Sequence, residues 1–273
     1  MLSLWIILAF AVLQGVLEWL PVSSSGQTVS LLTEFLKLEA DVAFTISLWL
    51  HLGTLIAVVV KYRKELWIYV NPKIKDEETI KWRLFLVLST IGTIIVGVPC
   101  YFLVDYFIDS PSIGEYVMLV IGIALLITAV FLYISRKKIS EGKKIDEISK
   151  KKMVASGLLQ GFSIIPGISR SGITMSGLLL MSVEKKDAIK GSFLMSIPAV
   201  LGGFLLTLLK TLIDGDSILP VEWWQLLLAV LVAAIVGYLT IEFFLYIARK
   251  YNFALICLLL GILTISLYLV REY

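Results

Sequence analysis

Six long runs of apolar residues dominate the chain, and short segments between them carry most of the charged side chains. Each run holds about 20 residues, the length with which an α-helix crosses roughly 30 Å of hydrocarbon. The pattern therefore predicts six transmembrane helices, at residues 42–60, 84–104, 116–134, 187–209, 223–248 and 253–270.

Two further apolar segments, residues 2–38 and 153–183, are each interrupted near the middle by proline, serine and glycine. These residue types favour turns and helix boundaries over the continuous helix of an ordinary span. The interruptions are also copies of one another: residues 13–32 align without a gap with residues 159–178, and nine of the twenty positions are identical. The chain is therefore a duplicated unit.

Composition places the chain in a membrane. Of its 273 residues, 59% are hydrophobic and only 16% are charged, which is more apolar surface than a soluble domain can hide. Both cysteines lie in apolar runs, so neither a disulfide framework nor a cysteine metal site is indicated. The N-terminus lacks a basic region before its apolar stretch, so we expect no cleaved signal peptide. The predicted fold class is an all-α integral membrane protein with six transmembrane helices and two re-entrant helical hairpins.

The basic residues segregate if each interrupted segment enters the membrane and returns to the side from which it came. Twenty lysines and arginines then lie on one side and three on the other, while Arg170 lies inside the second interrupted segment. Because basic loops stay in the cytoplasm, we expect a multi-pass cell-membrane protein with cytoplasmic basic loops and both termini outside.

Three predicted spans separate the two interrupted segments, and this odd number makes the segments enter the membrane from opposite faces. The first inverted repeat is residues 1–135, with its re-entrant hairpin at 2–38. A basic cytoplasmic linker at 136–152 leads to the second repeat, residues 153–273, with its hairpin at 153–183. Such repeats place functional sites near the membrane midplane. A topology with eight complete spans stays open, although the proline, serine and glycine breaks argue against it.

The first break combines a carboxylate with hydroxyl groups. Gln14 and Glu18 are four residues apart and share one helix face, and Pro21 disfavours continuation of that helix. The sequence Ser-Ser-Ser-Gly follows at residues 23–26, and we expect a new helix to begin near Gln27. Hydroxyls and free N–H groups at a helix start suit phosphate oxygens. The alternative is that the serines only support helix packing.

The second break carries a guanidinium. In the repeat alignment Arg170 corresponds to Ser24, and Glu18 corresponds to Ile164. A charge at membrane depth costs about 2.5 kcal/mol or more, so both charged groups indicate a polar site. Arg170 precedes a predicted helix start near Gly172, and its planar fork can bind a phosphate with two hydrogen bonds. The alternatives are a carboxylate turned toward the interface and a purely structural ion pair.

His51 is the only histidine and lies within the first predicted span. A lone buried histidine is commonly a packing residue, but at membrane depth an imidazole can also carry a proton. Both interpretations stay open.

Several other chemistries find no support. The chain has no P-loop, dinucleotide-binding or HExxH motif. Its basic residues lie in short loops without interleaved aromatics, so we expect no nucleic-acid partner. Phosphate is the ligand that the two breaks match best.

These residues resemble the undecaprenyl-pyrophosphate phosphatase family, also called bacitracin-resistance proteins. That family has an (E/Q)xxxE helix before a PVSSSG-type loop, matched by residues 14–18 and 21–26, and a PGxSRSxxT motif, matched in full by residues 166–174. The resemblance covers essentially the whole chain, including HLGT at residues 51–54. It implies two inverted repeats and hydrolysis of a polyprenyl diphosphate to the monophosphate and phosphate, at a site open to the outer side of the membrane. This reaction recycles the lipid carrier used to build cell-envelope polysaccharide.

The resemblance also implies roles and partners. Glu18 matches the second carboxylate of the motif, Ser24 a loop serine proposed as nucleophile or phosphate contact, and Arg170 the phosphate-binding arginine; His51 completes our catalytic candidates. A divalent cation, Mg²⁺ or Ca²⁺, is expected, held mainly by substrate phosphates and by Glu18. The partners are the polyprenyl diphosphate lipid and the bilayer, and a homodimer stays open. Our candidate substrate-binding residues are Gln14, Ser23, Ser25, Gly26, Gln27, Ser169, Ser171, Gly172 and Thr174.

Two positions depart from the family pattern. Many members have a glutamate in place of Gln14 and a histidine in place of Gln27. A glutamine cannot act as a base, so Glu18 or His51 would supply base catalysis, while Gln27 could only orient or hydrogen-bond phosphate. These amides also leave open a second function, a transporter or flippase of polyprenyl phosphate, because broken helices in inverted repeats are common in transporters.

Overall fold

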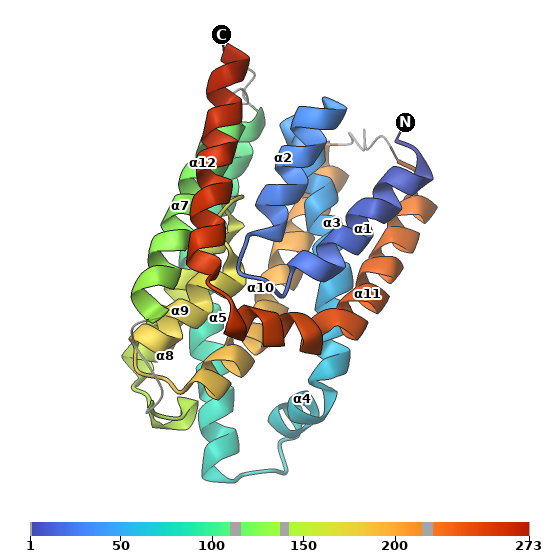
Figure 1. Ribbon diagram of the computed structural model, residues 1–273. Helices are drawn as coiled ribbons and strands as arrows, with labels where there is room; N and C mark the ends of the chain where they lie inside the picture. The colour runs from blue at the N-terminus through green and yellow to red at the C-terminus, as the bar shows by residue number, and fades with distance from the viewer. Residues whose placement is uncertain (1, 110–115, 137–141, 215–220, 273) are drawn as a thin grey trace.

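The computed structural model describes residues 2–109, 116–136, 142–214 and 221–272 (Figure 1). Within these residues the chain is almost entirely helical, with a single isolated β-bridge between Lys143 and Val183. Part of the predicted linker, residues 137–141, lies outside the described residues. The all-α fold class is confirmed.

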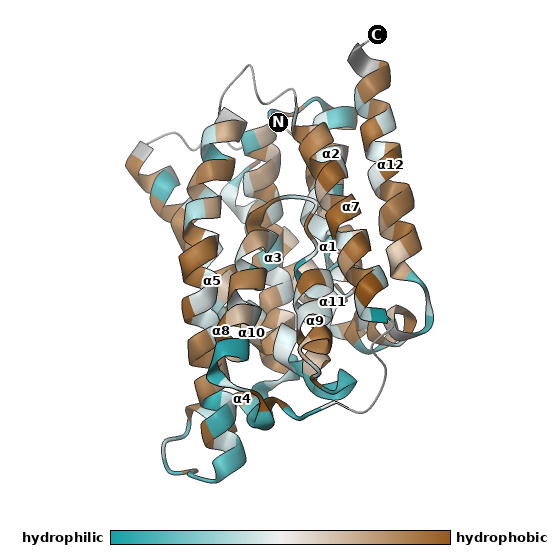
Figure 2. Ribbon diagram, turned by 90° about the vertical axis from the view of Figure 1, so that its left-hand side faces the viewer, coloured by the Kyte–Doolittle hydropathy of each residue, from teal (hydrophilic) through white to brown (hydrophobic). Residues whose placement is uncertain are grey.

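Six of the described helices are long and apolar enough to cross a membrane. They are α3 (Ala40–Lys61), α5 (Glu77–Asp109), α7 (Val117–Arg136), α10 (Lys185–Asp214), α11 (Trp223–Lys250) and α12 (Phe253–Glu272). Each covers nearly all of one predicted span, so the six-span membrane protein is also confirmed. Figure 2 shows hydrophobic residues along these helices and hydrophilic residues gathered toward one end of the molecule.

Both interrupted segments form a helix, an irregular loop and a second helix. The first segment contains α1 (Leu4–Leu17) and α2 (Ser24–Leu36). The second contains α8 (Lys150–Gly161), the 3-10 turn η2 (Phe162–Ile164) and α9 (Arg170–Leu180). In Figure 1, α1 descends from the N-terminus and α2 returns toward the same end, where the C-terminus also lies. Two shorter elements, α4 (Arg63–Val70) and η1 (Ile145–Glu147), lie at the opposite end.

The second helix of each segment begins earlier than the sequence predicts. The expected starts near Gln27 and Gly172 are wrong, because α2 begins at Ser24 and α9 begins at Arg170. Ser24 and Arg170 are aligned in the repeat, and each is the first residue of its helix. One carries a hydroxyl and the other a guanidinium at this equivalent position.

Serine side chains explain these early starts. The Ser23 Oγ accepts a hydrogen bond from the Gly26 N–H at 3.3 Å, and the Ser169 Oγ accepts one from the Gly172 N–H at 3.2 Å. A side-chain oxygen that satisfies an otherwise free N–H fixes the helix start directly after the capping residue. The two loops therefore end in the same way in both halves.

The two halves follow the same order of elements. Helices α1, α2, α3, α5 and α7 of the first half correspond to α8, α9, α10, α11 and α12 of the second. Helix α1 packs against α11, and its counterpart α8 packs against α5, while α3 meets α10 and α7 meets α12. Each half therefore supplies a long helix that covers the broken segment of the other half.

Glycine permits the closest of these contacts. Gly15 and Gly161 occupy equivalent repeat positions on α1 and α8. A Cβ on Gly15 would lie 3.0 Å from the Gly237 backbone nitrogen, and a Cβ on Gly161 would lie 2.7 Å from that of Gly97. Small residues let membrane helices approach closely enough for extensive van der Waals contact. A methyl group at Gly161 would force its neighbours to shift, and one at Gly15 would leave no free space beside α11.

We expect the substitution Gly161→Ala to destabilise the protein by about 1–3 kcal/mol, the usual cost of overpacking. The control is Gly202→Ala on α10, where an added Cβ would meet nothing within 4 Å. Thermal unfolding in detergent would show a lower midpoint for Gly161→Ala only. Equal midpoints for both variants would contradict the packing argument.

Candidate functional site

The loops of the two broken segments meet tip to tip. The Gly167 N–H donates a hydrogen bond to the Ser23 Oγ at 3.0 Å, across 144 positions of sequence. The Ser171 hydroxyl donates to the Leu20 carbonyl at 3.5 Å. A Cβ on Gly26 would lie 2.8 Å from the Gly167 nitrogen, so glycine is required where the tips touch.

Helices α7 and α12 hold the tips from the side. The Thr128 hydroxyl of α7 donates to the Gly167 carbonyl at 3.3 Å and its oxygen accepts from the Ser169 N–H at 3.1 Å. The Cys257 thiol of α12 donates to the Pro21 carbonyl at 2.9 Å, at the equivalent place in the first tip. Buried backbone groups outside a regular helix need other hydrogen-bond partners, and these side chains supply them.

Glu18 and Arg170 form an ion pair between the tips. The Arg170 Nη2 donates to the Glu18 Oε1, while the Glu18 Oε2 accepts from the Gln14 Nε2 and from the Ser24 hydroxyl, each at 2.8 Å. Glu18 is only 6% exposed. The alternative of a carboxylate turned toward the interface is therefore wrong, and the two charged groups that sequence analysis singled out lie together.

His51 joins this cluster from α3. Its Nδ1 lies 2.7 Å from the Ser47 carbonyl oxygen, which can only accept, so the Nδ1 carries a proton. The Nε2 lies 3.3 Å from the Ser24 Oγ and 3.3 Å from the Glu18 Oε2. His51 is thus more than a packing residue, because its second nitrogen faces the serine hydroxyl.

The ion pair with Glu18 leaves one hydrogen-bond donor of Arg170 unused. Its Nη1 is buried and has no hydrogen-bond partner in the described part of the chain, and its guanidinium carbon lies 5.9 Å from the centre of the Phe193 ring. A buried donor without a partner costs free energy. An anion placed beside Arg170 would satisfy this donor.

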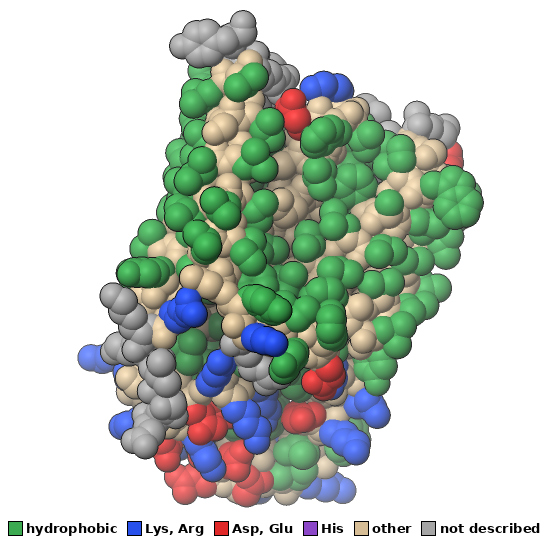
Figure 3. Space-filling view, viewed as in Figure 1, with side chains coloured by type: hydrophobic (Ala, Val, Ile, Leu, Met, Phe, Trp, Pro, Cys, Tyr) green, Lys and Arg blue, Asp and Glu red, His purple; other side chains and the backbone are tan. Residues whose placement is uncertain are grey.

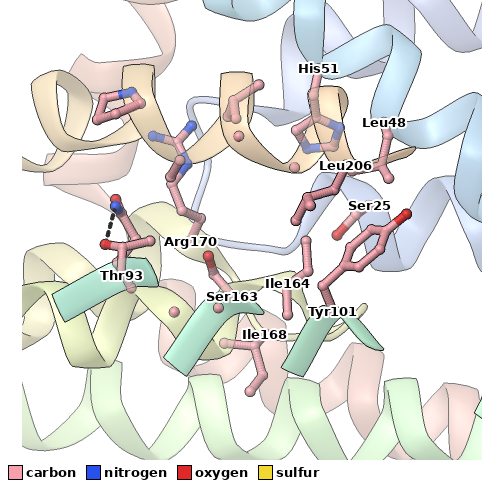
Figure 4. A pocket seen from close by; sticks show the side chains of 18 of the residues that line it. Ser25, Leu48, His51, Thr93, Tyr101, Ser163, Ile164, Ile168, Arg170 and Leu206 are labelled. Atoms are coloured by element: carbon pink, nitrogen blue, oxygen red, sulfur yellow. Dashed lines mark hydrogen bonds between the residues drawn. The ribbon is translucent and has the colours of Figure 1, made fainter. Parts of the chain in front are cut away.

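A cavity of about 440 Å³ opens in front of these groups. Its polar end contains the four catalytic candidates together with Ser23, Ser25, Ser169 and Ser171. Its remaining wall is mostly apolar and comes mainly from α3, α5, α10 and the second broken segment (Figure 4). Thr90, Thr93, Gln160 and Ser163 are polar residues in this part of the wall. Ile94 and Leu205, on facing helices, are 55% and 51% exposed although they line the cavity, so the apolar part is open sideways toward lipid.

The other predicted binding residues support the site without lining the cavity. Gln14 holds Glu18, whereas Gly26 and Gly172 donate to the serine caps. The Thr174 hydroxyl bonds to the Arg170 carbonyl at 2.7 Å and to Ser192. Gln27 is not among the residues that line the cavity, and its amide donates to the Val22 carbonyl at 3.4 Å.

Sequence analysis missed Gln160, which lines the cavity next to Thr93. The Gln160 amide donates to the Thr93 hydroxyl at 2.9 Å (Figure 4) and to the Met195 carbonyl at 3.0 Å. Its Oε1 is buried without a partner among the described residues. Gln160 is the repeat counterpart of Gln14 and could have been found from that identity, whereas Thr93 gave no sequence signal.

Fold and site together define an integral membrane protein with a buried cluster of charged and polar side chains between two helix tips, continuous with the apolar part of the cavity, called the apolar groove below. The chain belongs to the bacitracin resistance protein BacA family, whose family model matches residues 7–263.

Curated relatives span nearly the whole chain. An undecaprenyl-diphosphatase of Methanothrix thermoacetophila is 38% identical over 262 residues, or 95% of both chains. One of Methanopyrus kandleri is 34% identical, covering 95% of this chain and 94% of the relative. One of Methanococcoides burtonii is 36% identical, covering 97% and 98%.

We expect methylenediphosphonate, a diphosphate analogue that resists hydrolysis, to stabilise the protein through Arg170. At 100 times its dissociation constant a ligand of the native state adds about 2.7 kcal/mol, which thermal unfolding in detergent measures as a raised midpoint. Arg170→Ala should remove this shift of the midpoint. Lys64→Ala, which replaces an exposed lysine of α4, should leave the shift unchanged. A full shift in Arg170→Ala would show that the anion binds elsewhere.

Proposed function

We propose that this protein hydrolyses a polyprenyl diphosphate to the monophosphate and inorganic phosphate, and so recycles a lipid carrier of cell-envelope synthesis. The observation that carries the proposal is the buried contact of Glu18 with both Arg170 and Ser24, at the end of an apolar groove open to lipid. The relatives bear the name of a diphosphatase of undecaprenyl, a long polyprenyl group. That name describes hydrolysis and not transport, so hydrolysis is the function proposed.

The headgroup would bind between the two helix starts. Helices α2 and α9 begin at Ser24 and Arg170, and both residues line the cavity. Free N–H groups and the helix dipole attract anions at such ends. The Arg170 fork would bind the terminal phosphate through its free Nη1 and stabilise the negative charge of the transferred phosphoryl group.

Ser24 is the nucleophile in this proposal. Its hydroxyl first turns from the Glu18 Oε2, to which it donates in the structure, toward the His51 Nε2, which lies 3.3 Å from the Ser24 Oγ. The oxygen then attacks the terminal phosphorus, the proton passes to the Nε2, and the bond from phosphorus to the bridging oxygen breaks. The prenyl monophosphate leaves with that electron pair, and water then cleaves the phosphoserine to release phosphate and restore Ser24. The Ser47 carbonyl keeps the proton on Nδ1, so the Nε2 lone pair is available; Glu18, 3.3 Å away, would stabilise the resulting imidazolium.

A divalent cation fits this site only together with the substrate. The described residues contain no group of three or more histidine, cysteine, aspartate or glutamate side chains that could hold a metal, and Glu18 is the carboxylate that lines the cavity. Mg²⁺ is commonly bound by one or two carboxylates plus substrate phosphates and water. Glu18 would hold such an ion, or Ca²⁺, which would neutralise charge on the diphosphate.

We also propose that both broken segments are re-entrant and that the cavity opens to the outer side. The cavity-lining parts of α3, α5 and α10 lie toward the end of the molecule that holds both described termini (Figure 1). Lysine and arginine side chains gather toward the opposite end (Figure 3). Basic loops remain in the cytoplasm, which supports an outward mouth and a multi-pass cell-membrane location.

We expect Ser24→Ala and His51→Gln each to lower kcat by about 10²–10⁴, the usual range for loss of a proton-transfer group. The assay is phosphate release from farnesyl diphosphate in detergent, with chelator and then with added Mg²⁺. Gln27→Ala is the matched control, and it retains activity because Gln27 bonds to the Val22 carbonyl, outside the cavity lining. Acid quenching should trap phosphoserine in the wild-type protein. Full turnover in both Ser24→Ala and Arg170→Ala would contradict the proposed function.

The apolar groove should select for the prenyl chain. Gly202 lines the groove, and a Cβ there would meet nothing within 4 Å. Gly202→Phe should therefore raise the KM for undecaprenyl diphosphate about tenfold or more, equivalent to roughly 1.4 kcal/mol, and leave a short-chain diphosphate unaffected. Leu201→Phe, one residue away and outside the groove lining, is the control. Equal effects on the KM for long and short substrates would show that the prenyl chain binds elsewhere.

A further inference from the structure

A second cavity, of about 170 Å³, lies toward the basic end of the molecule, where helices of both halves converge. Helices α7, α9, α10 and α11 line it together with the start of α12. Pro21 of the first tip is part of its lining, whereas Ser23 and Ser24 line the first cavity. The two cavities therefore adjoin the same loop, yet they have different walls and different chemistry.

Positive charge surrounds this second cavity. Arg136 of α7, Lys185 of α10 and Lys250 of α11 line it, and none of its described lining residues is acidic. No ion pair joins these three side chains to a carboxylate in the described part of the chain. Three cations from three helices around one cavity favour an anionic ligand.

Uncharged groups in the wall also suit an anion. The Ser135 hydroxyl has one proton for two acceptors, the Ser176 Oγ at 2.9 Å and the Leu132 carbonyl at 3.1 Å. When it donates to the Ser176 Oγ, the Ser176 proton is left for an acceptor in the cavity. Ser176 is only 1% exposed and lines the cavity. The first turns of α10 and α12 line it as well, at Lys185 and Phe253, and N–H groups at helix starts add to the attraction.

The residues around the cavity are of the kinds found where hydrocarbon meets lipid headgroups. Leu132, Leu179 and Leu245 contribute apolar wall, and Tyr246 and Tyr251 nearby are 56% and 57% exposed. Tyrosine gathers where hydrocarbon meets headgroups. A phosphate group could therefore enter the cavity while acyl or prenyl chains remain on the apolar outer surface.

We propose that this second cavity binds the phosphate group of an anionic membrane lipid. The occupant contacts Arg136, Lys185 and Lys250 and accepts the Ser176 proton. Because Pro21 lines the cavity two residues before Ser23, a bound lipid also supports the loop that carries the first site. This binding site is separate from the hydrolytic centre, and it stands whether or not hydrolysis is the activity.

The test measures lipid retention by native mass spectrometry. The protein is taken from micelles that hold equal amounts of phosphatidylglycerol and phosphatidylcholine. The wild-type protein should retain the anionic lipid preferentially. A triple variant, Arg136→Gln with Lys185→Gln and Lys250→Gln, should bind it at least about tenfold more weakly, given the contribution of each basic residue near an anionic lipid. Ser176→Val, which keeps every charge, should weaken it as well.

The matched control is Lys64→Gln with Lys73→Gln and Lys75→Gln, which removes the same charge from exposed lysines outside the cavity. This variant should retain lipid like the wild type. Equal losses in both triple variants would overturn the proposal, because they would indicate only a general charge effect. A third arm adds inorganic phosphate alone: a stabilisation that depends on Arg136, Lys185 and Lys250, without lipid retention, would overturn the lipid as ligand and identify free phosphate instead.

Discussion

The ion pair between Glu18 and Arg170 is the interaction on which the rest of the structure depends. Either charge alone would be expensive to bury, and each lies where a helix meets a loop, Glu18 directly after α1 and Arg170 at the first residue of α9. Their contact joins the two halves of the chain at one point, and Gln14 and Ser24 fix the carboxylate further. The pair still leaves one buried guanidinium nitrogen without a partner. The fold thus builds a centre that an arriving anion completes.

Much of this architecture could be predicted from sequence because membrane hydropathy is a strong signal. The six spans follow from the length of apolar runs, and the meeting of Glu18 with Arg170 follows from the cost of isolated charges. The helix starts at Ser24 and Arg170 were missed by two or three residues, because side-chain capping and not hydropathy fixes them. The role of His51 depended on which face of α3 turns inward, a fact of tertiary packing. Thr93 lay in an apolar run and offered nothing to distinguish it.

The internal repeat explains both what the halves share and where they differ. Serine caps, glycine contacts and loop anchors occur in each half, so duplication supplied the frame. The chemistry comes from the positions that diverged: the first half contributes the carboxylate and the serine hydroxyl, and the second contributes the guanidinium. His51 has no counterpart of its own type, since it is the only histidine in the chain. A symmetric scaffold therefore carries an asymmetric centre.

The exchanged packing of α1 on α11 and of α8 on α5 also sets an order of events during biosynthesis. Helix α1 leaves the ribosome first, yet the glycine that receives it, Gly237, is made more than two hundred residues later. Glu18 likewise has no ion-pair partner until Arg170, 152 positions later, has been made, so the first broken segment cannot complete its contacts while the chain is short. Insertion of the long helices can proceed one after another, whereas assembly of the centre is a late step that needs nearly the complete chain.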